Sequence, residues 1–134
     1  MRGRKPSSII GDRDAVNTVP RAPAWLSKDA KAEWHRIMPL LIERRILTDA
    51  DMGSVESYCT ASGLIRQMQR TIASEGAIVA TDRGPRKHPA IAIQSDAMTR
   101  ARLLAAELGL TPVSRSRPAI RDDDDADDSS DLGC

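Results

Sequence analysis

Apolar residues recur at helical spacing in the segment from Ser27 to Leu47 and predict a first helix there. The residues of this apolar face are Ala30, Trp34, Ile37, Met38, Leu41 and Ile42. They lie three or four positions apart, apart from the two neighbour pairs at 37–38 and 41–42, which places them on one side of a helix. Ser27 suits the N-cap position. Pro39 lies inside the segment and lacks a backbone N–H, so it predicts a kink or a break.

A second helix is predicted to begin at Thr48, because Asp51 follows three residues later in a pattern similar to a capping box. The apolar positions of this helix again lie three or four residues apart: Tyr58, Ala61, Ile65, Met68 and Ile72. This spacing is typical of a coiled-coil seam, which packs either on the first helix or on a neighbouring subunit. Gly76 is expected to end the helix.

A β-prone run at 77–81 is followed by turn residues at 82–85 and by three basic side chains at 86–88. This order predicts a small β-hairpin or an ordered loop with a basic tip. Pro89 suits the first turn of a third helix, which is expected to end at Gly109. The apolar face of that helix comprises Ile93, Ala97, Ala101, Leu104 and Leu108. The predicted fold is therefore mainly α: a helical hairpin plus a third helix, with the small hairpin or ordered basic loop between helices two and three.

Composition and charge divide the chain into three segments. Residues 1–24 hold five basic and two acidic residues together with Pro and Gly, which predicts a flexible basic arm. Residues 25–112 hold twelve basic and ten acidic residues and form the predicted helical core. Residues 113–134 hold three arginines and seven aspartates, which predicts a disordered acidic tail. The net charge of +1 is thus the sum of opposed ends, an asymmetry that points to tails with partners.

The sequence carries no recognisable motif for catalysis. It has no glycine-rich phosphate loop of the Walker type, and His35 and His88 lack partners at metal-ligand spacing. Asp49 and Asp51 suit the first turn of a helix, and Cys59 suits a core position. We therefore predict no enzyme activity, no cofactor and no bound metal. No apolar run is long enough to span a membrane and no signal peptide is evident, which predicts a cytoplasmic protein.

Basic residues near the start of the chain are the first candidates for DNA binding. Arg2, Arg4 and Lys5 are interrupted by Gly3 and followed by Pro6. This string resembles the core of an AT-hook, whose arginines lie in a narrow A·T minor groove. The alternative is an ordinary basic terminus without a partner.

The predicted hairpin carries the second candidate cluster, formed by Arg83, Arg86, Lys87 and His88. Positive charge on a protruding element is suited to phosphate contacts, and the alternative is a solvated loop. The chain has two Trp, one Tyr and no Phe, a composition that argues against binding by stacking bases on a sheet of aromatic side chains. Contact with DNA is therefore expected to depend on charge.

A set of short motifs in a fixed order extends over nearly the whole chain except its Asp-rich end. In chain order the motifs are Arg2-Gly3-Arg4-Lys5-Pro6, Pro23-Ala24-Trp25-Leu26-Ser27, Ala30 to Trp34, Leu47-Thr48-Asp49-Ala50-Asp51, Tyr58-Cys59, Glu75-Gly76, Gly84, His88-Pro89-Ala90, Leu108-Gly109-Leu110-Thr111-Pro112 and Ser114-Arg115. Taken together, they resemble the phage terminase small subunit family, in the branch found in lambdoid tailed phages and their prophages.

The resemblance implies a non-enzymatic DNA-packaging factor that works in the host bacterial cytoplasm without a membrane. Such subunits form ring-shaped homo-oligomers, bind double-stranded viral DNA, and recruit and regulate the large subunit, which carries the ATPase and the nuclease. The residues expected at the oligomer interface or in the core are Trp34, Tyr58, Ile65, Met68, Ile72 and Leu104. The residues expected to dock the large subunit are Arg115, Arg117, Asp122 and Asp123.

Two other functions remain open on the sequence alone. One is a small dimeric DNA-binding regulator that places the third helix or the hairpin in a groove of DNA. The other is a protein-only adaptor that uses the acidic tail and the helical seam.

Overall fold

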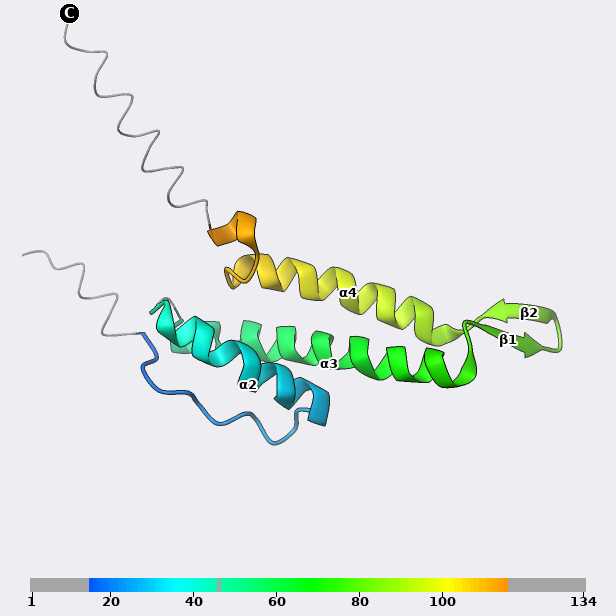
Figure 1. Ribbon diagram of the computed structural model, residues 1–134, viewed down its shortest axis with the longest axis horizontal. Coiled ribbons are helices and arrows are strands. Elements are labelled where there is room, and N and C mark those ends of the chain that lie inside the picture. The colour runs from blue at the N-terminus through cyan, green and yellow to red at the C-terminus, as the bar shows by residue number, and fades with distance from the viewer. Residues whose placement is uncertain (1–14, 46, 116–134) are drawn as a thin grey trace, which may run out of the picture.

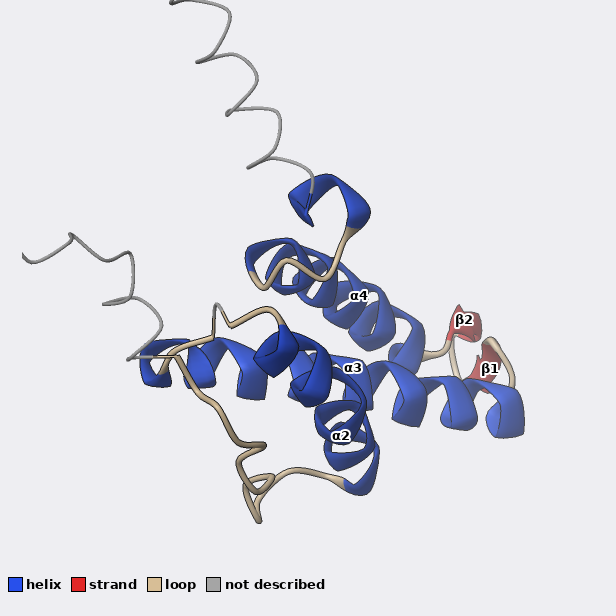
Figure 2. Ribbon diagram, turned by 60° about the vertical axis from the view of Figure 1, so that its left-hand side comes forward, coloured by secondary structure: helices blue, strands red, loops and turns tan. Residues whose placement is uncertain are grey.

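The computed structural model describes residues 15–45 and 47–115 (Figure 1). Its elements are α2 (Lys28–Glu43), the 3-10 turn η1 (Asp49–Asp51), α3 (Met52–Glu75), β1 (Ile78–Thr81), β2 (Gly84–Lys87) and α4 (Pro89–Glu107). Helix α3 lies between α2 and α4 and packs against both (Figure 2). The two strands pair antiparallel and extend beyond the end of the α3–α4 pair. The sequence prediction of a mainly helical fold with a small hairpin is thus confirmed.

Helix α2 begins where the sequence predicts and ends earlier. The Ser27 hydroxyl accepts a hydrogen bond from the Ala30 N–H at 3.2 Å, which confirms Ser27 as the N-cap. The predicted break at Pro39 is wrong, because α2 continues through Pro39 to Glu43. Pro39 lies on the exposed side of the helix, where water can satisfy the carbonyl group that its ring leaves without a donor. The chain then turns at Arg45, whose φ of 55° is incompatible with continuing the helix.

Helix α3 begins with the predicted capping interaction. The Thr48 N–H donates to Asp51 Oδ2 at 2.9 Å, and the Thr48 hydroxyl donates to the same oxygen at 3.0 Å. One 3-10 turn follows before the regular helix begins at Met52. At the other end Gly76 has a φ of 88°, and its N–H donates to the Ile72 carbonyl, so the predicted stop is confirmed.

The hydrophobic core lies mainly between α2 and α3. Its buried members are Leu26, Ala30, Trp34, Ile37, Met38, Leu41, Leu47, Val55, Cys59 and Leu108. On α3 the residues that face α2 are spaced by four, at Val55, Cys59 and Gly63. The predicted seam is only partly covered, because Ala61 is buried while its other members stay half-buried. Burial raises the pKa of the Cys59 thiol to about 12, consistent with the predicted core position.

Helices α2 and α3 approach each other closely at Gly63. A Cβ atom at this position would lie 2.7 Å from the backbone nitrogen of Ala30 and 3.0 Å from the Ser27 hydroxyl. The Gly63→Ala variant must therefore push the start of α2 away from α3, and we expect it to lower the free energy of unfolding by about 1–3 kcal/mol. Urea denaturation followed by circular dichroism measures this loss.

Gly53 provides the matched control for this substitution. It lies on the same helix, and a Cβ atom there would meet nothing within 4 Å. Gly53→Ala should therefore be neutral or stabilise the protein by up to about 1 kcal/mol. Equal stability of the Gly63→Ala variant and the wild-type protein would contradict the close contact between the two helices.

Candidate nucleic-acid interface

The hairpin β1–β2 is held in a defined shape by its turn. Its register pairs Ile78 with Lys87 at the base and Thr81 with Gly84 at the turn. Gly84 has a φ of 101°, which residues with a side chain rarely adopt and which lets the strand restart directly after the turn. The Thr81 hydroxyl donates to the Gly84 carbonyl at 2.7 Å and accepts from the Arg83 N–H at 3.3 Å. The turn thus fixes the backbone of Arg83 at the tip of the hairpin.

His88 fixes the base of the hairpin to both long helices. Its backbone N–H donates to the Ala77 carbonyl at 2.7 Å and so extends the strand pairing. Its Nδ1 accepts from the Ala90 N–H at 2.9 Å, which caps α4. Nδ1 must be unprotonated to accept this bond, so Nε2 carries the proton and donates to Glu75 Oε2 at 3.0 Å, at the end of α3. The His88 side chain is only 13% exposed, so it positions the hairpin and offers little surface to DNA.

Three hairpin cations remain available to an external anion. Arg83, Arg86 and Lys87 are exposed, and none of their side chains forms an ion pair or hydrogen bond with another described residue. The neighbouring acidic residue on the hairpin is Asp82 at the turn. Other arginines of the helices differ in this respect: Arg36, Arg66, Arg70 and Arg100 are each paired with a carboxylate. Three unpaired positive charges therefore lie close together on one protruding element.

A buried carboxylate between α2 and α3 is the feature that sequence reasoning missed. Glu33 is 2% exposed, and its oxygens accept hydrogen bonds from Arg36, from the Tyr58 hydroxyl at 2.9 Å and from Arg66 at 3.2 Å. Burial by itself raises the pKa of Glu33, but these donors and the two positive charges outweigh it, so the pKa lies below its ordinary value. The same environment raises the pKa of Tyr58, through burial and then through the bond to Glu33.

Two arginines of α3, Arg66 and Arg70, form ion pairs with carboxylates of α2. Arg66 joins Glu33, and Arg70 pairs with Asp29 of α2, so both link α3 to α2. The bond from Arg70 lowers the pKa of Asp29. The spacing of Glu33 and Arg36 on one helix was visible in the sequence, but the bonds between the two helices depend on tertiary packing alone.

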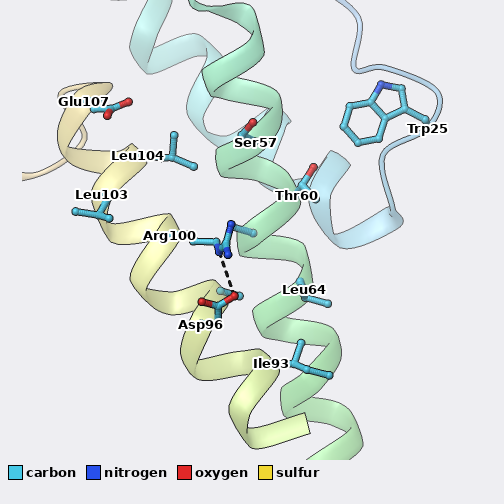
Figure 3. Close-up of a pocket in the computed structure, with 12 residues that line it drawn as sticks. Trp25, Ser57, Thr60, Leu64, Ile93, Asp96, Arg100, Leu103, Leu104 and Glu107 are labelled. Carbon is cyan, nitrogen blue, oxygen red and sulfur yellow. Dashed lines mark hydrogen bonds and ion pairs between the residues drawn. The ribbon is translucent and has the colours of Figure 1, made fainter. Parts of the chain in front are cut away.

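An apolar groove runs between α3 and α4 (Figure 3). Its larger apolar side chains include Leu64 from α3, Ile93, Leu103 and Leu104 from α4, and Trp25 from the segment before α2. Trp25 is 64% exposed and Leu103 is 59% exposed. Asp96 and Arg100 form an ion pair within α4 at the same groove, with 3.1 Å between Arg100 Nε and Asp96 Oδ2.

The residues that were expected at the interface or in the core differ in burial and in their contacts. Trp34 is buried, and its Nε1 donates to the Pro20 carbonyl at 3.0 Å, so it belongs to the core. Tyr58 is half-buried and bound to Glu33. Of the other expected residues on α3, three are also half-buried: Ile65, Met68 and Ile72. Leu104 lines the groove between α3 and α4.

Several expected site residues lie outside the described residues: Arg2, Arg4, Lys5, Arg117, Asp122 and Asp123. Arg115 is described, lies exposed in a helical turn at 112–115, and donates from Nε to the Thr111 carbonyl at 3.3 Å. Among residues 15–45 and 47–115, no group of three or more His, Cys, Asp or Glu side chains is placed to hold a metal ion. No helix in the described part of the chain has the length and apolarity needed to cross a membrane.

Comparison with known proteins decides the family. The family model described as phage terminase, small subunit, matches residues 30–125. The chain belongs to this family. No curated protein and no solved structure matches the chain. Terminase small subunits are generally non-catalytic packaging factors, and the expected family is confirmed, while its lambdoid branch stays a prediction.

The family match covers the elements that carry the surface features of this terminase small subunit. It spans α3, the hairpin with its three unpaired cations, and α4. Apart from Trp25, the residues that line the apolar groove also lie within it. The matched region therefore contains the hairpin cations and, apart from Trp25, the lining of the groove.

Proposed function

We propose that this terminase small subunit is a DNA-binding packaging factor that contacts duplex viral DNA through the β1–β2 hairpin. The observation that carries the proposal is the gathering of three unpaired cations on an element whose base is fixed to α3 and α4. Fixed positive charge on a protruding ribbon can reach the phosphates of a duplex without rearrangement of the helices. Arg2, Arg4 and Lys5 are proposed to add further phosphate contacts.

The proposed binding is electrostatic and collective. Each phosphate that a cation neutralises releases condensed counterions, so affinity falls steeply as salt rises. Three cations on one subunit make a weak site, and several subunits joined in one assembly engage the same DNA with a much higher combined affinity. The proposal therefore includes a ring-shaped homo-oligomer.

The α3–α4 groove is the proposed binding site for a neighbouring subunit. Trp25, Ile93 and Leu103 line it and are exposed, although the burial of large apolar side chains away from water is favourable. A subunit that inserts a different surface into this groove makes a head-to-tail contact, and such contacts close into a ring when the rotation allows it. Leu104 lines the groove and takes part in this contact, together with the half-buried residues of α3.

The large terminase subunit is proposed to supply the ATPase and the nuclease. The C-terminal segment 113–134 is proposed to dock it, through Arg115 and Arg117 or through Asp122 and Asp123. The complex is proposed to act in the host bacterial cytoplasm, and the small subunit itself to use no cofactor.

The full-length chain and a fluorescent duplex test this function together. Native mass spectrometry and fluorescence anisotropy should show a stable assembly of many subunits that binds duplex DNA. A dimer that protects a short palindrome would favour the DNA-binding regulator, and an absence of binding even at low salt would favour the protein-only adaptor.

A charge in the groove tests the proposed contact between subunits. Leu103→Asp places a carboxylate on an exposed position of α4, so the helix should persist while the assembly dissociates to smaller species. Native mass spectrometry measures the change. Leu40→Asp is the matched control, because Leu40 is an exposed leucine on α2 away from the groove, and its assembly should match that of the wild type. If the assembly of the Leu103→Asp variant keeps the mass of the wild-type assembly, the groove is not part of the interface between subunits.

A further inference from the structure

The hairpin has two different faces. Side chains of paired residues in an antiparallel ribbon lie on the same face, and faces alternate along each strand. The pairs Ile78–Lys87 and Ala80–Pro85 therefore share one face, which is apolar except for Lys87 at the base. Val79 and Arg86 share the other face. Val79 is half-buried, whereas Ile78 is 68% exposed and Ala80 and Pro85 are also exposed.

This apolar face has no cover among the described residues. A two-stranded hairpin in water is marginally stable by itself. Ile78 and Pro85 are exposed, so their side chains add little to its stability through burial within the subunit. The base of the hairpin is nevertheless held by two hydrogen bonds of His88. Its side chain bonds to Glu75, and its backbone N–H donates to the Ala77 carbonyl. A ribbon that is held at its base and presents exposed apolar side chains is suited to insertion into a partner.

The charged residues around the apolar face indicate the kind of partner that fits it. Arg83 lies at the turn, Lys87 at the base of the apolar face and Arg86 on the opposite face. The nearby carboxylates are Asp82 at the turn and Glu75, which is bound to His88 at the base. A second copy of the hairpin would bring three like charges against these three, which opposes pairing between copies. A duplex nucleic acid offers an apolar stack of bases between two rows of phosphates and matches both properties.

We propose that the hairpin enters the minor groove of duplex DNA with the Ile78–Pro85 face toward the bases, and that Pro85 acts as a wedge that bends the duplex. The inference rests on the proposed function, because it requires that the hairpin binds DNA. Apolar wedges in the minor groove, proline among them, partly unstack a base step and bend the duplex toward the major groove. Arg83, Arg86 and Lys87 then lie close to the phosphates that border the groove.

The wedge also predicts how this subunit selects DNA. Ile78, Ala80 and Pro85 have no side-chain hydrogen-bonding group, so this face cannot read base edges directly. The affinity of this face for DNA should instead depend on how easily a base step opens, and TA steps open more easily than GC-rich sequence. Sequence preference should therefore follow the flexibility of the DNA.

Bending of a duplex labelled at both ends with a fluorescent donor and acceptor tests the wedge. The wild-type protein should raise energy transfer on a duplex with central TA steps, and bind it roughly tenfold more tightly than a GC-rich duplex. The double variant Ile78→Thr/Pro85→Thr keeps strand-forming residues and the three cations. It should lose the rise in energy transfer and the preference, while its affinity for GC-rich duplex stays within about threefold of the wild type. Val79→Thr is the control on the opposite face and should bend DNA as the wild type does.

The possible results separate the wedge from the proposed function. Binding without bending, or equal bending by the wild type and the double variant, would overturn the wedge and leave the electrostatic contact standing. No binding of duplex DNA by the wild type would overturn both. A change in native mass on the double substitution would assign the face to contact between copies and overturn the wedge.

Discussion

Replacing Arg83, Arg86 and Lys87 together with alanine is expected to weaken duplex DNA binding by roughly 100-fold or more at about 0.1 M salt. The three side chains are exposed and unpaired among the described residues, so their removal leaves no buried group without a partner. The effect is multiplied because every subunit of an assembly is altered. Anisotropy of a labelled duplex across a salt series measures the affinity, and the salt dependence should become shallower by about 0.9 for each phosphate that the variant no longer neutralises.

A second triple variant controls for net charge. Lys28, Lys31 and Arg102 lie on helices away from the hairpin and make no ion pair with another described residue. Replacing these three with alanine removes the same charge and should change the affinity only slightly. If both triple variants weaken binding equally, overall charge binds the DNA and the hairpin has no special role. If the hairpin variant fails to assemble, the hairpin is an interface between subunits.

Removal of the Glu33 charge is expected to have the largest effect on folding among the ionic contacts. Glu33→Gln keeps the size of the side chain but leaves Arg36, Arg66 and Tyr58 facing a neutral amide. We expect a loss of about 1–3 kcal/mol in the free energy of unfolding. The loss stays below that of a fully buried pair, because Arg36 is 57% exposed and Arg66 is 47% exposed, and both can turn toward water.

Asp96→Asn is the matched control for the buried carboxylate. It breaks the Asp96–Arg100 pair on α4, where both side chains are largely exposed, and should cost less than about 1 kcal/mol. Chemical denaturation of the two variants and the wild type compares the three free energies. Equal stability of the Glu33→Gln and Asp96→Asn variants would contradict the role of Glu33 in joining α2 to α3.

The same carboxylate makes stability depend on pH. Because folding lowers the pKa of Glu33 below its ordinary value of 4.5, its charge stabilises the fold at higher pH. This contribution declines as pH falls below 4.5 and is lost once pH passes the pKa of the folded state. The free energy of unfolding should thus fall less steeply with acid in Glu33→Gln than in the wild type.

Local signals in the sequence predicted the elements well. Ser27, the Thr48–Asp51 capping pair, Gly76 and Pro89 each act within a few residues, so their effects can be recognised without the fold. The prediction of a break at Pro39 gave too much weight to the missing N–H, because Pro39 lies outside the apolar face, where water can satisfy the freed carbonyl group.

The candidate surfaces were predicted only in part. The hairpin and its cations follow from the order of β-prone, turn and basic residues, so the sequence located them. The sequence did not reveal that His88 joins Glu75 and caps α4, since that contact needs both helix ends in place. The buried Glu33 and the α3–α4 groove likewise depend on how the three helices pack, which periodicity alone does not specify.

Photocrosslinking from the turn of the hairpin tests the central claim most directly. A benzoylphenylalanine placed at Asp82, which is exposed at the tip, should crosslink to duplex DNA when the full-length protein is bound. The same group placed at Leu40, exposed on α2, should give no crosslink. Crosslinking at Asp82 alone is the result that the account predicts. DNA bound and crosslinked from Leu40 but not from Asp82 would contradict it.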